Sequence, residues 1–144
     1  MNVYLDTSIV IADTALIHPH KANVLELFRK IRVSRWTPVI AAHGLAEAYS
    51  VLTRTPFQPR ITSADAWRSL QQNVLGSFEI ISLSRTDYSD VLRHCAAEGW
   101  TGGMIFDALH MQAARKTKCA RVYTLNVAHF RRIAPDLGDR ILSP

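Results

Sequence analysis

The sequence has no long apolar run, although 48% of its 144 residues are hydrophobic. No stretch approaches the roughly 18 consecutive apolar residues that a membrane-spanning helix needs. The first residues reach the acidic Asp6 before a charged and then apolar export signal can form. We therefore expect a globular, cytoplasmic protein with no membrane partner.

Cysteine is scarce as well. Cys95 and Cys119 are the only two, they lie far apart, and no C-x-x-C motif is present. This pattern supplies no disulfide framework and no zinc site of the Cys/His type, so we interpret both thiols as free and buried. Four scattered histidines also lack a metal-ligand spacing: His18, His20, His43 and His94.

Two nucleotide- and phosphate-handling classes are excluded by missing residues. No G-x-G-x-x-G motif follows the first expected strand, which argues against a dinucleotide-binding fold. Haloacid-dehalogenase-like phosphatases also carry an Asp after the first strand, but they need a second Asp two residues later. Ser8 occupies that position here, so this class is excluded too.

Acidic residues are fewer than basic ones, 12 against 17, which leaves a net charge of +5. Such an excess favours polyanionic partners. The segment 115–132 holds six basic residues and no acid. A solvated helix end explains the basic residues at 115–118, because cations favour helix C-termini. Arg131 and Arg132 are the candidates for contact with nucleic-acid phosphates.

The hydrophobic periodicity predicts strands that alternate with helices. Strands are expected at 2–5, 37–41, 78–83, 121–125 and 141–142, and helices at 20–32, after Gly44, at 63–74, from Thr86 to about Gly99 and at 104–116. Ser63 and Thr86 are the expected N-caps of two helices, and a helix or turn is expected to begin near Asp6. The alternation indicates an α/β sandwich whose mostly parallel central sheet is flanked by helices, in one domain over 1–144.

Oxygen-bearing side chains stand where such a fold binds ligands. Asp6 and Asn126 follow expected strands, and Glu47 and Asp107 lie in early helical turns. Ligands of open α/β sheets bind beyond the carboxyl ends of the strands, so these four side chains can converge there. Oxygen ligands suit Mg²⁺ or Mn²⁺, and converging carboxylates would repel one another without a cation.

Simpler roles exist for each residue taken alone. Asp6 can be a helix cap, and Glu47 a surface acid, although its neighbours are apolar. Asp107 lies among apolar residues, where a charge usually has a partner or a cation. We interpret His110, on the same helix face as Asp107, as a packing or hydrogen-bonding residue, and His129 as a residue that packs a turn.

Four segments together resemble the motifs of PIN-domain ribonucleases. They are V-Y-L-D-T-S (3–8), L-A-E-A-Y-S-V-L-T-R (45–54), F-D-A-L-H-M-Q-A-A (106–114) and Y-T-L-N-V-A-H-F (123–130), and they occur in that family's order and spacing. The sequence is most similar to the VapC toxins, which are small single-domain PIN proteins. The resemblance implies a PIN-like three-layer sandwich.

The resemblance also implies a function and roles for particular residues. It implies a Mg²⁺-dependent endoribonuclease in which Mn²⁺ can substitute, with Asp6, Glu47 and Asp107 as metal ligands and Asn126 at a fourth position where many relatives carry Asp. Asn126 offers a neutral oxygen, which puts a second metal ion in question. The expected supporting residues are Thr7, Ser8 and Thr124, and the general base stays open.

The expected partners are an RNA substrate, a VapB-like antitoxin and a second copy of the chain in a homodimer. Transfer, ribosomal and messenger RNA all stay open as substrates. Two alternatives also stay open. One is a degenerate PIN domain that binds RNA or protein without cleavage, and the other is an RNA-processing PIN nuclease without an antitoxin.

Overall fold

Five parallel strands form one sheet in the computed structural model, which describes residues 1–144. The strand order is β3-β2-β1-β4-β5. The strands are β1 (Asn2–Leu5), β2 (Thr37–Ala41), β3 (Glu79–Ile81), β4 (Arg121–Tyr123) and β5 (Ile141–Leu142). The predicted mostly parallel sheet is confirmed, and every pairing in it is parallel.

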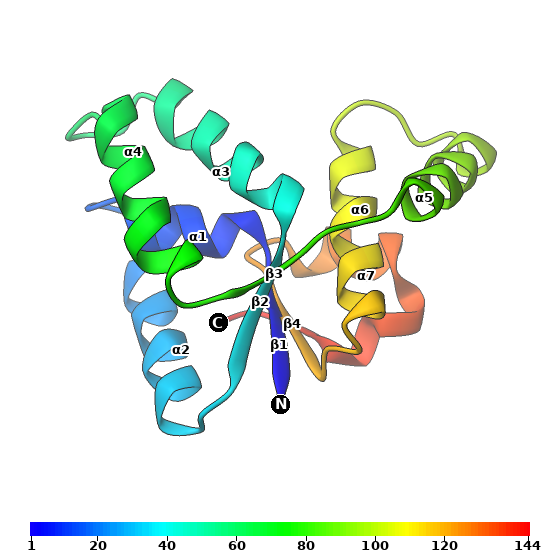
Figure 1. The fold of residues 1–144 in the computed structure, drawn as a ribbon, viewed down its shortest axis with the longest axis horizontal. Coiled ribbons are helices and arrows are strands. Elements are labelled where there is room, and N and C mark those ends of the chain that lie inside the picture. Colours follow the sequence, from blue (N-terminus) through cyan, green and yellow to red (C-terminus); the bar gives the residue numbers. More distant parts are fainter.

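Helices cover both faces of the sheet (Figure 1). They are α1 (Thr7–Thr14), α2 (Lys21–Val33), α3 (Ala42–Arg54), α4 (Ser63–Ser69), a π-helical turn η1 (Leu70–Leu75), α5 (Arg85–Glu98), α6 (Met104–Lys116), α7 (Val127–Ile133) and a 3-10 turn η2 (Pro135–Arg140). Figure 1 shows α1 to α4 on one side of the sheet and α5 to α7 on the other, which confirms the three-layer sandwich. None of these helices combines the length and the hydropathy that crossing a bilayer requires.

The central strand β1 supplies side chains to both helical layers. Val3 and Leu5 pack in one cluster with residues of α1 and α2, whereas Tyr4 packs in another with residues of α5, α6 and α7. Successive side chains of a strand point to opposite faces, so a strand covered on both faces is apolar throughout. The apolar run at the start of the sequence therefore places the following residue, Asp6, at the end of a rigid, buried strand.

Two predicted helix caps are wrong by one or two residues. Helix α4 is capped by Thr62 rather than by Ser63, because the Thr62 side chain accepts a hydrogen bond from the backbone of Asp65. Helix α5 is capped by Ser84 rather than by Thr86. Ser84 is the cap because Asp87 stands three residues later and its carboxylate accepts a hydrogen bond from the Ser84 backbone N–H, which completes a capping box.

The last predicted long strand, 121–125, is shorter than expected, and the turn expected after it is the helix α7. Beyond Tyr123, backbone N–H groups donate to side-chain hydroxyls instead of to a neighbouring strand. The Leu125 N–H donates to the Ser8 hydroxyl at 3.1 Å, and the Asn126 N–H donates to the Thr124 hydroxyl at 3.0 Å. The ladder of β4 consequently stops at Tyr123. The predicted strand 78–83 likewise shortens to Glu79–Ile81.

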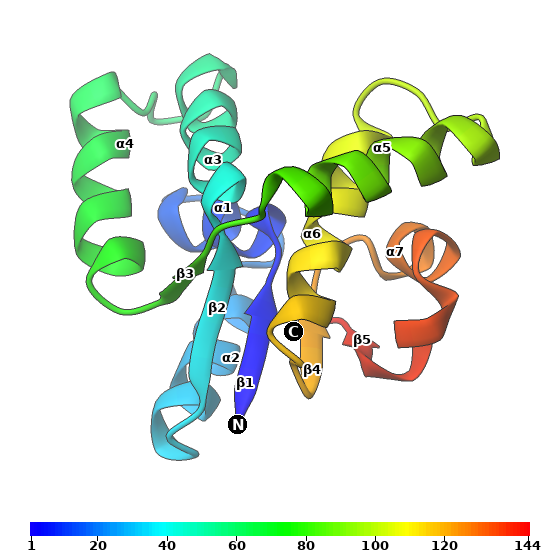
Figure 2. The ribbon, with the colours of Figure 1, turned by 45° about the vertical axis from the view of Figure 1, so that its right-hand side comes forward.

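The strand order has a reversal between β1 and β4. The chain runs outward through β1, β2 and β3, and then returns to the other side of β1 for β4 and β5. Figure 2 shows β1, β2 and β4 running in the same direction. At such a switch point the connections leave in opposite directions, which opens a crevice at the carboxyl ends of the two strands. Asp6 follows β1 and Thr124 follows β4.

Candidate active site

Asp6 is almost fully buried at the N-terminus of α1, with 4% of its surface exposed. Its Oδ2 accepts hydrogen bonds from the Ser8 hydroxyl at 2.7 Å and from the Thr124 hydroxyl at 2.9 Å. The side chain makes no capping hydrogen bond to the helix backbone, and no hydrogen bond reaches Oδ1. The cap role therefore does not explain Asp6. Two hydroxyls orient this carboxylate and leave one oxygen free.

Glu47 reaches the same region from α3, one strand away. Its Oε2 is buried, lies 3.6 Å from Nε2 of His110 and has no hydrogen-bond partner. Burial raises the pKa of the Glu47 carboxyl, but His110, Thr7 and His43 together lower it by more, so the net pKa is lower than usual. Glu47 is therefore charged at neutral pH and is not a solvated surface acid.

Asp107 lies in the first turn of α6, half-buried beside the same histidine. Burial raises the pKa of its carboxyl, and the negative charge of Asp6 raises it further, against the hydrogen bond from His129. That hydrogen bond runs from Nε2 of His129 to Oδ2 of Asp107 over 2.8 Å. His129, on α7, therefore orients Asp107, a role that the packing interpretation of this residue missed.

His110 is the centre around which these carboxylates are arranged. It is completely buried, and its Nε2 lies 3.9 Å from Oδ1 of Asp6 and 3.6 Å from Oε2 of Glu47. Tyr4 holds the other ring nitrogen at 2.6 Å, and the Thr7 hydroxyl is 3.1 Å from Nε2. Burial lowers the pKa of the imidazole, but the surrounding carboxylates raise it by more than burial lowers it, so the net shift is upward. The interpretation of His110 as a hydrogen-bonding residue agrees with these contacts.

His43 is a site residue that the sequence analysis set aside. It lies one turn before Glu47 on α3, and its ring centroid is 4.4 Å from that of His110. Gly44 permits this approach, since a Cβ there would lie 3.0 Å from Cε1 of His110. Burial, followed by the neighbouring His110, lowers the pKa of His43 to about 4. The H-x-x-x-E spacing was the available signal, because residues four apart share a helix face.

The structure brings the three predicted acidic residues near one another but leaves Asn126 at the surface. Asp6, Glu47 and Asp107 all flank His110, but the one group of three His, Cys, Asp or Glu side chains whose ligand atoms lie within 4.8 Å of one another is His43, Glu47 and His110. Asn126 is exposed at the start of α7, and its side chain makes no hydrogen bond to the acids.

A cavity of about 610 Å³ opens onto Glu47 and Asp107. Its lining includes His43, Glu47, Ser50, Arg54, Phe106 and Asp107. Arg54 brings a cation to the rim, is exposed and forms no salt bridge. A larger cavity of about 1070 Å³ lies between α2 and η1, and none of the predicted site residues lines it.

The two arginines proposed for phosphate contact differ in the structure. Arg131 donates hydrogen bonds from its guanidinium to the carbonyls of Gly138 at 3.1 Å and Ile141 at 2.9 Å. It thereby ties α7 to the C-terminal strand. Arg132 is exposed and makes no hydrogen bond or salt bridge, so its charge is available to a ligand.

The parallel sheet, the helices on both of its faces and the carboxylates at its switch point can together be compared with known protein families. A family model described as the PIN domain matches residues 3–135. The chain belongs to the PIN-domain family, which confirms the resemblance found in its four motifs.

Individual relatives narrow the comparison. The chain is 33% identical to Ribonuclease VapC40 of Mycobacterium tuberculosis over 105 residues, which cover 72% of each protein. Among solved structures, the Mycobacterium tuberculosis toxin VapC20, titled a sarcin-ricin loop cleaving toxin, superposes with a TM-score of 0.69 at 12% identity, covering 88% of this chain and 92% of that one. VapBC2 from Rickettsia felis, bound to a DNA fragment from its promoter, gives a TM-score of 0.68 at 22% identity over 100% of this chain and 99% of that one. These two structures show the fold alone.

Proposed function

We propose that this protein is a metal-dependent endoribonuclease of the VapC type, the toxin of a toxin–antitoxin pair. The observation that carries the proposal is the cluster of Asp6, Glu47 and Asp107 around one buried histidine, at the switch point of the sheet. The homology to a protein named Ribonuclease VapC40 supports the ribonuclease activity.

The side chains present suit a hard divalent cation. Oδ1 of Asp6 accepts no hydrogen bond, and Oε2 of Glu47 is buried without a partner. Both oxygens lie close to the same atom, Nε2 of His110, at 3.9 Å and 3.6 Å respectively. Carboxylate oxygens are the ligands that Mg²⁺ and Mn²⁺ prefer. We assign Asp6, Glu47 and Asp107 as the residues that would hold the ion. Asn126 would lie at the margin of the site as a neutral oxygen donor.

The remaining residues of the site position these ligands and the RNA. Ser8 and Thr124 hold the Asp6 carboxylate, and His129 holds that of Asp107. When bound, the ion supplies Lewis-acid charge at the scissile phosphate and a water of lowered pKa. Arg54 on the cavity rim is placed to contact an RNA phosphate.

Cleavage of total cellular RNA by the purified protein tests the proposal. We expect discrete fragments with Mg²⁺ or Mn²⁺ and none with a chelator, and the fragments identify the RNA that is cut. RNA binding that survives chelation, without cleavage at any Mg²⁺ concentration, would instead establish a degenerate PIN domain that only binds.

The toxin assignment is tested separately from the nuclease. We expect expression of the chain to arrest growth, and co-expression of a small neighbouring gene product to relieve the arrest through a stable complex. Nuclease activity without growth arrest would point to an RNA-processing enzyme. We also expect the purified protein to be a homodimer in solution, which sedimentation measures.

We expect alanine substitutions of the two arginines at the end of α7 to affect different properties, RNA binding in one case and stability in the other. Arg132→Ala should flatten the slope of log binding constant against log salt by roughly 0.7–0.9, the effect of one lost phosphate contact. Arg131→Ala should instead lower the free energy of unfolding by about 1 kcal/mol, because two backbone carbonyls lose their donor. Both are measured in chelator, by RNA binding and by urea unfolding. An unchanged salt slope in Arg132→Ala would mean that Arg132 contacts no RNA phosphate and is only a solvated surface residue.

A further inference from the structure

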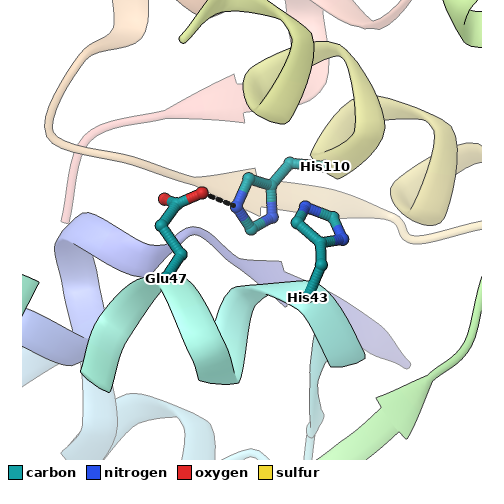
Figure 3. A group of neighbouring side chains, drawn as sticks. All are labelled: His43, Glu47 and His110. Atoms are coloured by element: carbon teal, nitrogen blue, oxygen red, sulfur yellow. Dashed lines mark ion pairs between the residues drawn. The ribbon is translucent and has the colours of Figure 1, made fainter. Parts of the chain in front are cut away.

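Only two buried side-chain polar atoms in the protein lack a hydrogen-bond partner, Nε2 of His43 and Oε2 of Glu47. A buried polar atom without a partner costs about 1–3 kcal/mol, so a pair of them requires an explanation. Both atoms belong to α3, one helical turn apart. Figure 3 shows both side chains projecting from α3 toward His110 on α6.

The three side chains are spaced for one small cation. Their ligand atoms all lie within 4.8 Å of one another, and Oε2 of Glu47 is 3.6 Å from Nε2 of His110. Around a tetrahedral Zn²⁺, with ligands about 2.0–2.1 Å from the metal, neighbouring ligand atoms are about 3.3 Å apart. The Glu47–His110 pair is already near that separation. The separations that involve His43 are within 4.8 Å, so His43 would have to move closer to complete the set.

We propose that His43, Glu47 and His110 form a site for a borderline transition metal such as Zn²⁺, distinct from the all-carboxylate site and sharing Glu47 with it. Two imidazole nitrogens and one carboxylate oxygen are a donor set of zinc sites with three protein ligands. Mg²⁺ prefers oxygen ligands alone and is selected against by the two histidines. His43 and Glu47 also line the cavity of about 610 Å³, which would give the ion a route to the site.

Tyr4 supports the buried member of this site. Its hydroxyl is 2.6 Å from Nδ1 of His110 and accepts a hydrogen bond from the Ala41 N–H at 3.2 Å. A metal on Nε2 requires the proton of the ring to lie on Nδ1, where the Tyr4 oxygen accepts it. The Thr7 hydroxyl, 3.1 Å from Nε2, would have to give up that nitrogen to the metal. Ligating histidines ordinarily have such an outer partner, which fixes the ring orientation.

Glu47 belongs to both sites, so the two cannot be filled independently. Zn²⁺ held by the histidines withdraws Glu47 from the carboxylate site, and we expect micromolar Zn²⁺ to inhibit RNA cleavage in the presence of millimolar Mg²⁺. This consequence rests on the proposed nuclease function, whereas the binding of Zn²⁺ does not.

Titration of the purified chain with Zn²⁺ alone, in competition with a chromogenic chelator, tests the site. We expect one ion per chain, at least about 100-fold weaker binding in His43→Gln, and unchanged binding in His94→Gln, an exposed histidine on α5 outside the cluster. Co²⁺ added to the unaltered protein should give the intense visible absorption of a four-coordinate site. This second readout does not depend on any variant.

The outcomes separate the two proposals. Absence of stoichiometric Zn²⁺ binding, or equal affinity in folded His43→Gln, overturns the zinc site whatever the nuclease assay shows. Tight Zn²⁺ binding that depends on His43 supports the site even if no RNA is cleaved. Zn²⁺ inhibition that persists unchanged in His43→Gln overturns the claim that the shared Glu47 couples the two sites.

Discussion

Asp6→Asn is expected to lower the rate of Mg²⁺-dependent RNA cleavage at least about 100-fold without lowering the melting temperature. Loss of one ligand charge from a metal that stabilises the transition state costs several kcal/mol, and each 1.36 kcal/mol is a factor of ten. The amide keeps the size of the carboxylate and one oxygen that can accept from both Ser8 and Thr124. It removes the repulsion between Asp6 and Asp107, but also the attraction between Asp6 and His110, so Tm should stay about the same.

The matched control is Asp139→Asn, the same substitution at an exposed aspartate of η2 that forms no salt bridge. It should leave both the cleavage rate and Tm unchanged. Single-turnover cleavage of a defined RNA and thermal unfolding are measured for both variants. Cleavage by Asp6→Asn within a factor of three of the unaltered protein would remove Asp6 from the site.

Tyr4→Phe is expected to lower the free energy of unfolding by about 2–4 kcal/mol, although it deletes a single oxygen atom. Tyr4 is fully buried, and its hydroxyl accepts from the backbone N–H of Ala41 and shares a hydrogen bond with Nδ1 of His110. Both partners are also fully buried. Each would lose its partner with no water to replace it, at about 1–3 kcal/mol for each group.

Tyr49→Phe serves as the control for this loss, since Tyr49 lies on α3 with 40% of its surface exposed. It should change the free energy of unfolding by less than about 0.5 kcal/mol. Urea unfolding followed by circular dichroism measures both variants. Equal stabilities for Tyr4→Phe and Tyr49→Phe would mean that the buried hydroxyl is not part of the hydrogen-bond network described for His110.

The sequence determined the elements of the fold and the class of protein, because these follow from local patterns. A short apolar run forms a buried strand, and residues at 3.6-residue spacing form the buried stripe of a helix. Alternation of the two requires crossovers and so a parallel sheet. The placement of Asp6 directly after the first strand follows from the same local reading. The roles of Asp6, Glu47 and Asp107 as metal ligands came instead from the resemblance of the four motifs to PIN domains.

Caps and strand ends were less predictable because they depend on competition between neighbouring groups. Ser84 and Thr86 have the same capping chemistry, and only the reciprocal hydrogen bond, which the Asp87 carboxylate accepts from the Ser84 backbone, decides between them. The strand at 121–125 ends at Tyr123 because hydroxyls of Ser8 and Thr124 accept from the backbone beyond it. Ser8 is far from 121–125 in the sequence, so the local sequence pattern could not indicate where this strand ends.

Only the tertiary structure decided which of the candidate residues meet and which are engaged elsewhere. His43 and His110 are 67 positions apart in the sequence, and they meet because the fold brings the start of α3 against α6, with Gly44 leaving room for the His110 ring. Arg131 and Arg132 are indistinguishable in the sequence. In the fold, the Arg131 guanidinium donates hydrogen bonds to the backbone carbonyls of Gly138 and Ile141. Such contacts depend on how distant segments pack, and local periodicity carries no record of that packing.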